Sequence, residues 1–284
     1  MSEAAKQPSF LHKYLAFFHI RFSAGLQYRA AALAGIATQF FWGFMETLLY
    51  NAFWRGDPSA FPMGLQATVN YIWFRQAMLS MFNSWHFDSS IFSAITGGSI
   101  SMELIRPCDL YAMWLTKSCA SRLSRVVLRC MPILVIASFL PAGYGMRFPE
   151  GCETAGDVVF ALAVTLISLI GSLLVVSSIE MFVYISTFYT LNHAGVRMVY
   201  GMVAGFLGGE LVPLPFLPDG FYDVLQYLPF AAVQSAPCLI WGGTLAGMDA
   251  LRTVGLQFIW AAVLIVTGRM WLNRSLKRVV VQGG

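Results

Sequence analysis

The sequence predicts an all-α membrane protein with six transmembrane helices and with both termini on the cytoplasmic side. Of its residues, 57% are hydrophobic and only 11% are charged, a balance outside the usual range for soluble domains. A helix needs roughly 20 mostly apolar residues to cross about 30 Å of hydrocarbon. No segment shows the sustained alternation of a barrel strand. The segments that meet the requirement for a helix are 30–54, 66–85, 123–141, 158–187, 196–212 and 250–272.

The positions of the basic residues predict the orientation. With both termini inside, most Lys and Arg residues fall on the cytoplasmic side. The outer loops then hold only Arg55, Arg147 and Arg252, beside a larger number of acidic residues. Lys and Arg resist translocation across the membrane, so this distribution favours cytoplasmic termini. The net charge of +4 follows from that topology and does not indicate a nucleic-acid partner.

Residues 1–29 precede the first predicted span and belong to the same single domain, which covers 1–284. Apolar side chains recur here at steps of three and four residues, opposite Lys13 and Gln27. This pattern predicts an amphipathic helix that lies in the cytoplasmic interface of the membrane. A frayed cytoplasmic tail is the alternative. The apolar positions are Leu11, Tyr14, Leu15, Phe18, Phe22 and Leu26.

Ionisable residues inside apolar spans are energetically costly and need a partner or water. Glu46 and Arg75 lie at similar depths in the first two spans, which predicts that they pair. The functional alternative is that Arg75 faces a central path and contacts the transported substrate. Glu180, near the inner end of the fourth span, has a depth comparable to that of Arg125 and Arg129, which favours a second, structural pair.

The loop between the second and third spans is too polar to cross the membrane and too apolar for a free linker. Asp88 or Ser89 can cap a short helix that runs to Thr96, the glycines at 97–98 can end it, and Pro107 marks a further break. We therefore expect a short pair of amphipathic helices that projects into the cytoplasm. Such a pair is either a docking handle for another protein or a solvated elbow between spans.

The segment 208–230, GGELVPLPFLPDGFYDVLQYLPF, follows the fifth span. Its four prolines break it too often for it to cross the membrane as one helix, and it is too apolar for a solvated loop. A segment of this kind at the mouth of a membrane bundle typically caps or gates a path. We expect a short helix over 221–228. The following stretch, 231–248, is expected to dip into the membrane without crossing it.

The chain lacks the sequence motifs that would provide chemistry of its own. It has no G-x-x-x-x-G-K-[ST] loop for a nucleotide, no H-E-x-x-H or paired metal-ligand spacing, and no G-x-S-x-G nucleophile. We therefore predict no catalytic residue, no metal site and no cofactor bound by this chain. This absence disfavours a membrane-embedded enzyme. Cys152 and Cys238 both fall outside, and their pairing is left open.

The order of these elements resembles the membrane subunits of ABC type-2 exporters along essentially the whole chain. The ending is similar to a permease branch that tends to be encoded beside a separate ATPase. The order and spacing of several motifs carry the match: G-x-I-x-x-x-L-I-R-P at 98–107, the proline steps at 211–213, 216–218 and 228–230, and the ending at 276–278 and 282–284.

The resemblance implies a half-transporter for which ATP is hydrolysed elsewhere. Two permease copies, identical or different, would sit in the lipid of a bacterial inner membrane on two ABC ATPase subunits that hold ATP and Mg²⁺. The coupling loop would act through Asp88, Ile91, Phe92, Ile95, Glu103, Arg106 and Pro107. The translocation path at the dimer axis would be lined by Tyr71, Phe74, Arg75, Met78, Met202 and Phe206. The outer gate would contain Pro213, Pro215, Pro218 and Pro229.

A secondary transporter or channel driven by an ion gradient is the alternative function. Such a protein needs acids or histidines at the membrane midplane as ion sites, and it often shows an internal repeat. Only Glu46 comes near the midplane, and the two halves of the chain do not repeat each other. The exporter is therefore the favoured prediction, and its outward direction is implied by the resemblance alone.

Overall fold

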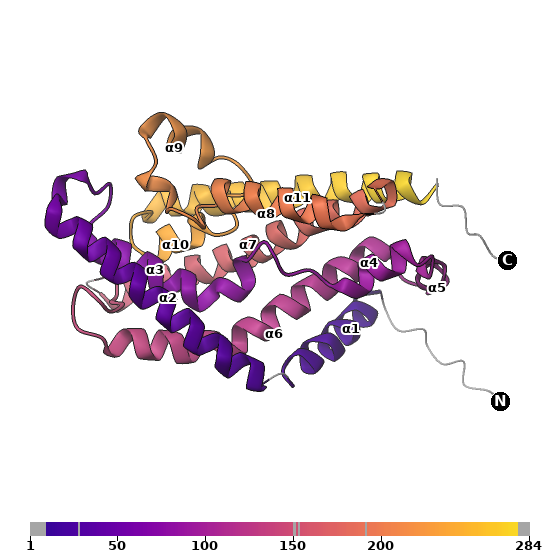
Figure 1. The fold of residues 1–284 in the computed structure, drawn as a ribbon, viewed down its shortest axis with the longest axis horizontal. Coiled ribbons are helices and arrows are strands. Elements are labelled where there is room, and N and C mark those ends of the chain that lie inside the picture. Colours follow the sequence, from indigo (N-terminus) through magenta and orange to yellow (C-terminus); the bar gives the residue numbers. More distant parts are fainter. Residues whose placement is uncertain (1–9, 28, 150–151, 153, 191, 278–284) are drawn as a thin grey trace.

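The computed structural model describes residues 10–27, 29–149, 152, 154–190 and 192–277, and every regular element in these ranges is a helix (Figure 1). The predicted ending at 278 and 282–284 and the first nine residues lie outside the described part. In order the elements are α1 (Phe10–Gly25), α2 (Arg29–Gly56), η1 (Pro58–Ala60), α3 (Leu65–Phe82), α4 (Ser89–Thr96), α5 (Ile100–Leu104), α6 (Leu110–Phe139), α7 (Ala155–Thr190), α8 (His193–Leu207), η2 (Leu214–Phe216), α9 (Asp219–Leu225), α10 (Ser235–Trp241) and α11 (Gly247–Leu276).

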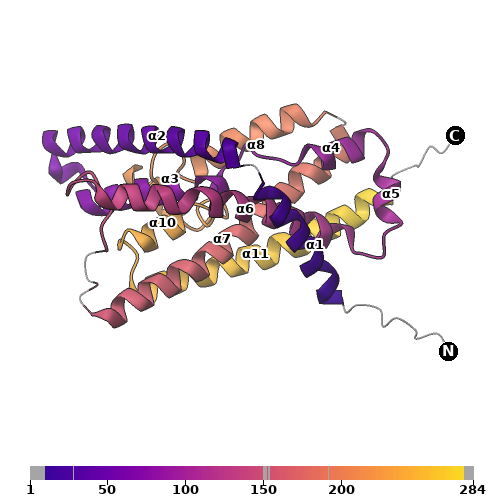
Figure 2. The same cartoon turned by 90° about the horizontal axis from the view of Figure 1, so that it is seen from below.

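The helices connect two distinct ends of the molecule. The start of α1, both α4 and α5, and the end of α11 lie at one end, whereas α9 and the end of α2 lie at the other (Figures 1 and 2). The stretch 83–109 between α3 and α6, which contains α4 and α5, is called the elbow. We call the two ends of the molecule the elbow end and the α9 end. The predicted cytoplasmic and outer segments are thus separated along the long axis, as an N-in, C-in topology requires.

The centre of the bundle is α3, which is buried on all sides. Of its 18 residues, 14 are buried, and its neighbours are α2, α6, α7 and α10. Tyr71 and Trp73 lie fully inside, and the indole of Trp73 donates to the carbonyl of Tyr144 at 2.7 Å. Arg75 is on the same helix and is therefore enclosed by protein.

Small residues let the longest helices approach closely. In lipid there is little hydrophobic gain from burying an apolar face, so helices associate through tight packing and hydrogen bonds. A side chain at Gly268 of α11 would collide with the ring of Tyr111 on α6. One at Gly171 of α7 would press on Gln257 of α11. These contacts join α11 to both α6 and α7.

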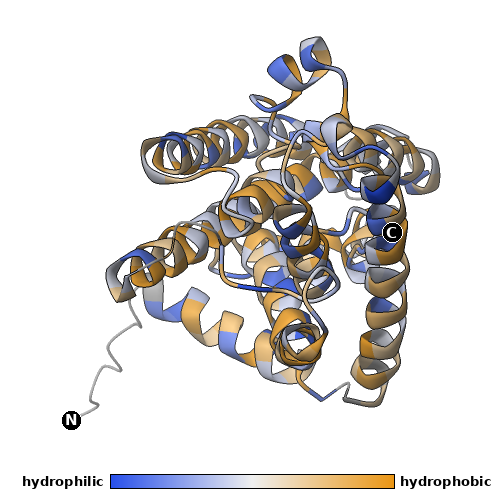
Figure 3. Cartoon of the chain, turned by 90° about the vertical axis from the view of Figure 1, so that its left-hand side faces the viewer, coloured by the Kyte–Doolittle hydropathy of each residue, from blue (hydrophilic) through white to orange (hydrophobic). Residues whose placement is uncertain are grey.

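Two helices, α7 and α11, are long and apolar enough to cross a membrane when judged by length and composition. Of the other long helices in the described part of the chain, α2, α3 and α6 do not reach the same mean hydropathy, and α8 has only 15 residues. The six-span topology remains a prediction. Large apolar side chains such as Phe139 and Val159 are exposed on the surface. In Figure 3, orange marks the many hydrophobic residues along the outer helices. Such exposure suits a lipid environment.

The N-terminal helix lies against the bundle. Tyr14 and Phe17 of α1 pack against the main core, and the Tyr14 hydroxyl accepts a hydrogen bond of 2.8 Å from the backbone N–H of Asp109. Leu15 and Ile20 are exposed on the other side. The predicted apolar stripe is therefore divided, because one part of it binds α6 and the rest faces outward.

Candidate functional site

A buried ion pair lies at the junction of α3, α6 and α7. The guanidinium of Arg122 is 2.6 Å from the Glu180 carboxylate, and the two side chains are only 1% and 3% exposed. Arg122 also donates to the carbonyls of Met81 and Asn83, where α3 ends. The Ser118 hydroxyl donates to the same carboxylate. One guanidinium thus closes the end of α3 and binds α7.

This arrangement corrects the predicted partners of Glu180. We expected Arg125 or Arg129, but the partner is Arg122. Arg125 instead donates to the carbonyl of Ser121 in its own helix at 2.9 Å. Depth estimated along separate helices cannot resolve one helical turn. The free carbonyls at the end of α3 select Arg122, because only a donor at that level satisfies them and Glu180 together.

The elbow between α3 and α6 begins with a charged helix cap. The Asp88 carboxylate accepts from the backbone N–H of Ser90 at 2.9 Å and pairs with Lys117 of α6 at 2.8 Å. The backbone N–H of Asp88 donates to the hydroxyl of Tyr184 on α7 at 2.8 Å. The predicted cap therefore ties the start of α4 to two long helices.

The apolar side of α4 faces the inside of the protein. Ile91, Phe92 and Ile95 are buried in the main core. The Phe92 ring packs on Tyr184 at 4.9 Å and stacks on His193 at the start of α8, with ring centroids 4.2 Å apart. These three predicted coupling residues are consequently inaccessible to another protein in this conformation.

The large apolar side chains that the elbow exposes between α4 and α6 lie at its tip. Met102, Leu104 and Ile105 are 70%, 44% and 78% exposed, and we call these three residues the apolar tip. Arg106 and Pro107 follow and are also exposed. Glu103 points back instead, since its carboxylate accepts from the Trp114 indole at 2.8 Å. Sequence reasoning missed the apolar tip, although Leu104 and Ile105 belong to the motif that it quoted.

The side chains of α8 hold the elbow from the other side. The Arg197 guanidinium lies over the rings of Phe87 and Phe92, at 5.0 and 5.7 Å from their centroids. Phe87 also packs edge-on against Tyr200 at 5.7 Å. An aromatic cluster therefore joins α4 directly to α8, in addition to the chain connection through α6 and α7.

The predicted path residues divide into two groups. Tyr71, Phe74, Arg75 and Met78 are buried within the chain. Met202 and Phe206 of α8 are 63% and 48% exposed. Of the residues of α8, only Tyr200 and Gly205 are buried, so this helix presents most of its surface outward. The structure thus does not bring the two groups to one surface.

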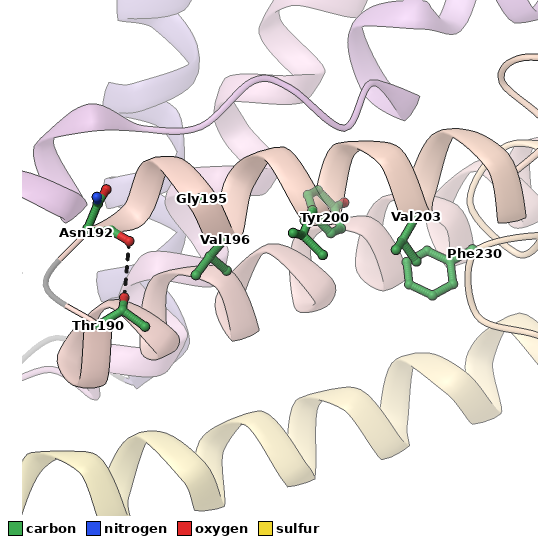
Figure 4. Close-up of a pocket in the computed structure, with 8 residues that line it drawn as sticks. Thr190, Asn192, Gly195, Val196, Tyr200, Val203 and Phe230 are labelled. Atoms are coloured by element: carbon green, nitrogen blue, oxygen red, sulfur yellow. Dashed lines mark hydrogen bonds between the residues drawn. The ribbon is translucent and has the colours of Figure 1, made fainter.

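A groove of about 620 Å³ runs along α8. Figure 4 shows its side chains in a row from Asn192 at the elbow end to Phe230 at the far end. The polar end is defined by the Thr190 hydroxyl, which donates to the Asn192 carbonyl at 3.2 Å. The remaining lining is largely apolar: Gly195, Val196, Val199, Tyr200 and Val203.

The segment 208–230, which we call the outer segment, is held by side chains that donate to its backbone carbonyls. Arg75 donates to Glu210 O at 2.9 Å, and Gln234 donates to Gly209 O at 2.9 Å. Just beyond its other end, Gln257 of α11 donates to Ala232 O at 2.7 Å, and Ser172 of α7 donates to Val233 O. Both ends of the segment are therefore fixed to the bundle.

Arg75 has a second partner in α2. Its guanidinium contacts the Glu46 carboxylate, which also accepts from Gln76 at 3.3 Å. This is the pair that the similar depths of Glu46 and Arg75 in the first two spans predict. The path-facing alternative for Arg75 has less support, because its side chain is enclosed between α2, α3 and the outer segment. Arg75 thus connects two spans to the turn at Glu210.

The four prolines of the outer segment lie at breaks between short helices. Pro213 and Pro215 begin η2, Pro218 precedes α9, and Pro229 follows it. Phe216 of η2 packs on Tyr50 at the end of α2, with centroids 5.1 Å apart. The helix expected over 221–228 is α9, and the expected dipping stretch contains α10. This segment therefore folds over the α9 end.

In the described part of the chain, no group of three or more His, Cys, Asp or Glu side chains is placed to hold a metal ion. All five cysteines are free, including Cys152 and Cys238. The predicted absence of a bound cofactor stays a prediction.

The Asp88 cap predicts a pH dependence. Burial raises the pKa of Asp88, but hydrogen bonds and charge from Lys117, together with hydrogen bonds from Ser90, outweigh it and hold the pKa below its usual value. A lowered pKa stabilises the fold above the unfolded pKa of about 4. That contribution is lost as the pH falls through the folded pKa.

We therefore expect Asp88→Asn to lower the thermal unfolding temperature near neutral pH. The difference from the unaltered protein should shrink as the pH falls below about 4, and it should vanish below the folded pKa, where both chains carry a neutral side chain. Thermal unfolding of both proteins across this pH range checks the expectation. A difference that persists unchanged at the acid end would contradict it.

The all-helical bundle, its buried charges and its exposed apolar faces define a helical membrane protein. Comparison with known families shows which kind of membrane protein it is. A family model described as ABC-2 family transporter protein matches residues 65–283. The chain belongs to that family. The family predicted from the sequence is confirmed. The match begins at α3, so α1 and α2 precede it. Neither the curated proteins nor the solved structures provide a match.

Family membership makes the chain a membrane component of a transporter. Such components are generally not catalytic themselves, and the family implies association with an ABC ATPase.

Proposed function

We propose that this chain is the permease subunit of an ATP-driven exporter in the bacterial cytoplasmic membrane. It would cross the membrane six times with both termini inside. A second permease copy would complete the path, and a separate ATPase would bind ATP and Mg²⁺. The observation that carries this proposal is the apolar tip, an exposed apolar patch at the elbow end of a chain from a family that works with ATPases.

The apolar tip, with Arg106, is the proposed docking surface for the ATPase. Large apolar side chains exposed in water, next to a charged rim, are typical of protein interfaces. The buried part of the elbow would act as its support. Asp88 and Glu103 bind α6, and Phe92 packs inside, so force applied at the tip reaches the bundle through fixed contacts.

Two connections would carry this movement to the rest of the protein. One runs through Lys117 and Trp114 into α6. The other runs through Phe92 to His193 and Arg197 of α8. Packed side chains transmit displacement because the interior is dense and little compressible. Movement of the elbow would therefore shift α8 directly.

The outward surface of α8 is the proposed wall of the translocation path and the contact with the second copy. Its exposed Met202 and Phe206 and the groove ending at Phe230 support this assignment. The buried group around Tyr71 and Met78 would join the path only after α8 and α3 move apart. The outer segment with its four prolines is the proposed gate, released when the bonds to its carbonyls break.

A charge placed in the apolar tip tests the proposal. Ile105→Asp should reduce stimulation of the co-purifying ATPase by at least about tenfold, because burying an unpaired carboxylate in an interface costs well over 1.4 kcal/mol. Arg106→Ala should weaken the stimulation less. The measurement is ATP hydrolysis by the reconstituted complex together with export of a co-expressed cargo.

Ser89→Asp is the matched control, because it adds the same charge at an exposed first-turn position of α4, where an acid is favourable. It should leave stimulation near the original value. Normal stimulation and export with Ile105→Asp would remove the coupling assignment. ATPase activity from this chain alone would refute the proposed function.

A further inference from the structure

A second groove, of about 570 Å³, lies between α9, α10 and the outer third of α11, away from the groove on α8. Its lining changes character along α11. Asp249, Arg252 and Thr253 are at the α9 end, and Leu256 and Ile259 follow toward the middle of the bundle. Leu239 of α10 provides apolar surface opposite. The groove is therefore charged at its mouth and apolar inside.

A glycine leaves space along the α11 side of this groove. Gly255 lines it, and a side chain there would project into empty space without meeting another atom. Below Gly255, the Trp260 indole donates to the carbonyl of Tyr227 at 2.8 Å and joins α11 to the end of the outer segment. The space at Gly255 is thus a feature of the folded chain that one substitution can fill.

The charges at the mouth contribute little to the fold. Asp249 and Arg252 lie 3.1 Å apart on one helix face, and their side chains are 69% and 74% exposed. An exposed pair of this kind stabilises a protein by less than about 1 kcal/mol. Both charges are accordingly accessible to a ligand that carries one charge of each sign.

The length of the groove matches one leaflet of a membrane. From Asp249 to Ile259 the helix rises about 15 Å at 1.5 Å per residue, which is about half of the 30 Å hydrocarbon thickness. Tyr222 and Tyr227 also line the groove, and aromatic residues of this kind are enriched where membrane proteins meet the lipid interface. The charged and apolar parts thus have the order of a headgroup and its acyl chain.

We propose that this groove binds one zwitterionic glycerophospholipid of the outer leaflet. Arg252 would bind the phosphate and Asp249 the ammonium group. One acyl chain would lie over Gly255 and end beside Ile259. The proposal rests on the six-span orientation given above, which places the α9 end at the outer surface. Since Gln226 of the outer segment and Leu239 of α10 also line the groove, the lipid would pack between these elements and α11.

Native mass spectrometry of the full-length permease tests this site without the ATPase. The protein is extracted from nanodiscs that contain phosphatidylethanolamine and phosphatidylglycerol in equal amounts. We expect one retained phosphatidylethanolamine per chain. Gly255→Phe should abolish its retention by filling the groove. Arg252→Gln should reduce retention about tenfold, since it removes a charge-assisted contact with the phosphate.

Val263→Phe is the matched control, because it adds comparable bulk to an exposed position of α11 beyond the groove. It should retain the lipid as the unaltered chain does. Equal retention by Gly255→Phe, or retention of the anionic lipid instead, would overturn the proposal. So would cross-linking of position 255 to a second copy of the chain. Lipid retention together with failed ATPase coupling would overturn the exporter and leave this site standing.

Discussion

Replacing Arg122 by Gln is expected to destabilise the protein by about 3–5 kcal/mol, the usual effect of removing one partner of a buried ion pair. Glu180 would be left in the bundle without its cation, although Ser118 would still donate to it. The carbonyls of Met81 and Asn83 at the end of α3 would also lose their donor. Thermal unfolding in detergent measures the effect.

Arg125→Gln is the control for this prediction. It removes the same charge from the same helix, but within the described part of the chain the Arg125 guanidinium donates only to Ser121 of its own helix. We expect less than about 1 kcal/mol from this change. The double replacement of Arg122 and Glu180 by apolar residues should be milder than Arg122→Gln, because no unpaired charge remains. Equal losses for Arg122→Gln and Arg125→Gln would show that the ion pair does not stabilise the junction.

Replacing Arg75 by Gln is expected to release the outer segment and to destabilise the protein by about 2–3 kcal/mol, the range for lost hydrogen bonds to a charged group. The change removes the donor to Glu210 O and the partner of Glu46 at the same time. Hydrogen exchange of the segment 208–230 should become faster. Exchange in α7, which Arg75 does not contact in the described interactions, should remain slow.

Glu46→Gln separates the two roles of Arg75. It removes the ion pair but leaves the bond from Arg75 to the outer segment. We expect it to lower the unfolding temperature while the exchange rate of 208–230 stays close to the original. If Glu46→Gln accelerates exchange there as much as Arg75→Gln, the bond to Glu210 O does not hold the segment closed.

Much of the fold follows from local sequence patterns. Apolar length predicts the long helices, and Pro and Gly predict the breaks around α9, because these effects act within a few residues. Asp88 or Ser89 was predicted as a cap for the same reason, and the structure uses Asp88, whose side chain accepts from Ser90 N–H. The start of α6 was harder to predict from the sequence. It begins at Leu110, whereas hydropathy starts the span at 123, because paired charges at Lys117 and Arg122 lower the apolar signal without ending the helix.

The candidate site depended more on contacts between distant segments. Periodicity identifies an apolar side of α4, but only packing shows that Phe92 faces α7 and α8 and that Ile105 remains outside. An apolar residue at a helix surface has the same local signal whether a neighbouring helix or a partner protein covers it. For this reason the exposed docking residues could not be separated from the buried ones by sequence alone.

By itself, the sequence determined the helical membrane class, the family and the need for internal partners for Glu46 and Glu180. Those conclusions depend on composition and on the high energy of charge in an apolar surrounding. The tertiary structure decided that Arg122 pairs with Glu180, that α3 is enclosed, and that the elbow exposes its tip. Such choices are made by the rotation and depth of whole helices, which depend on close packing between segments far apart in the chain.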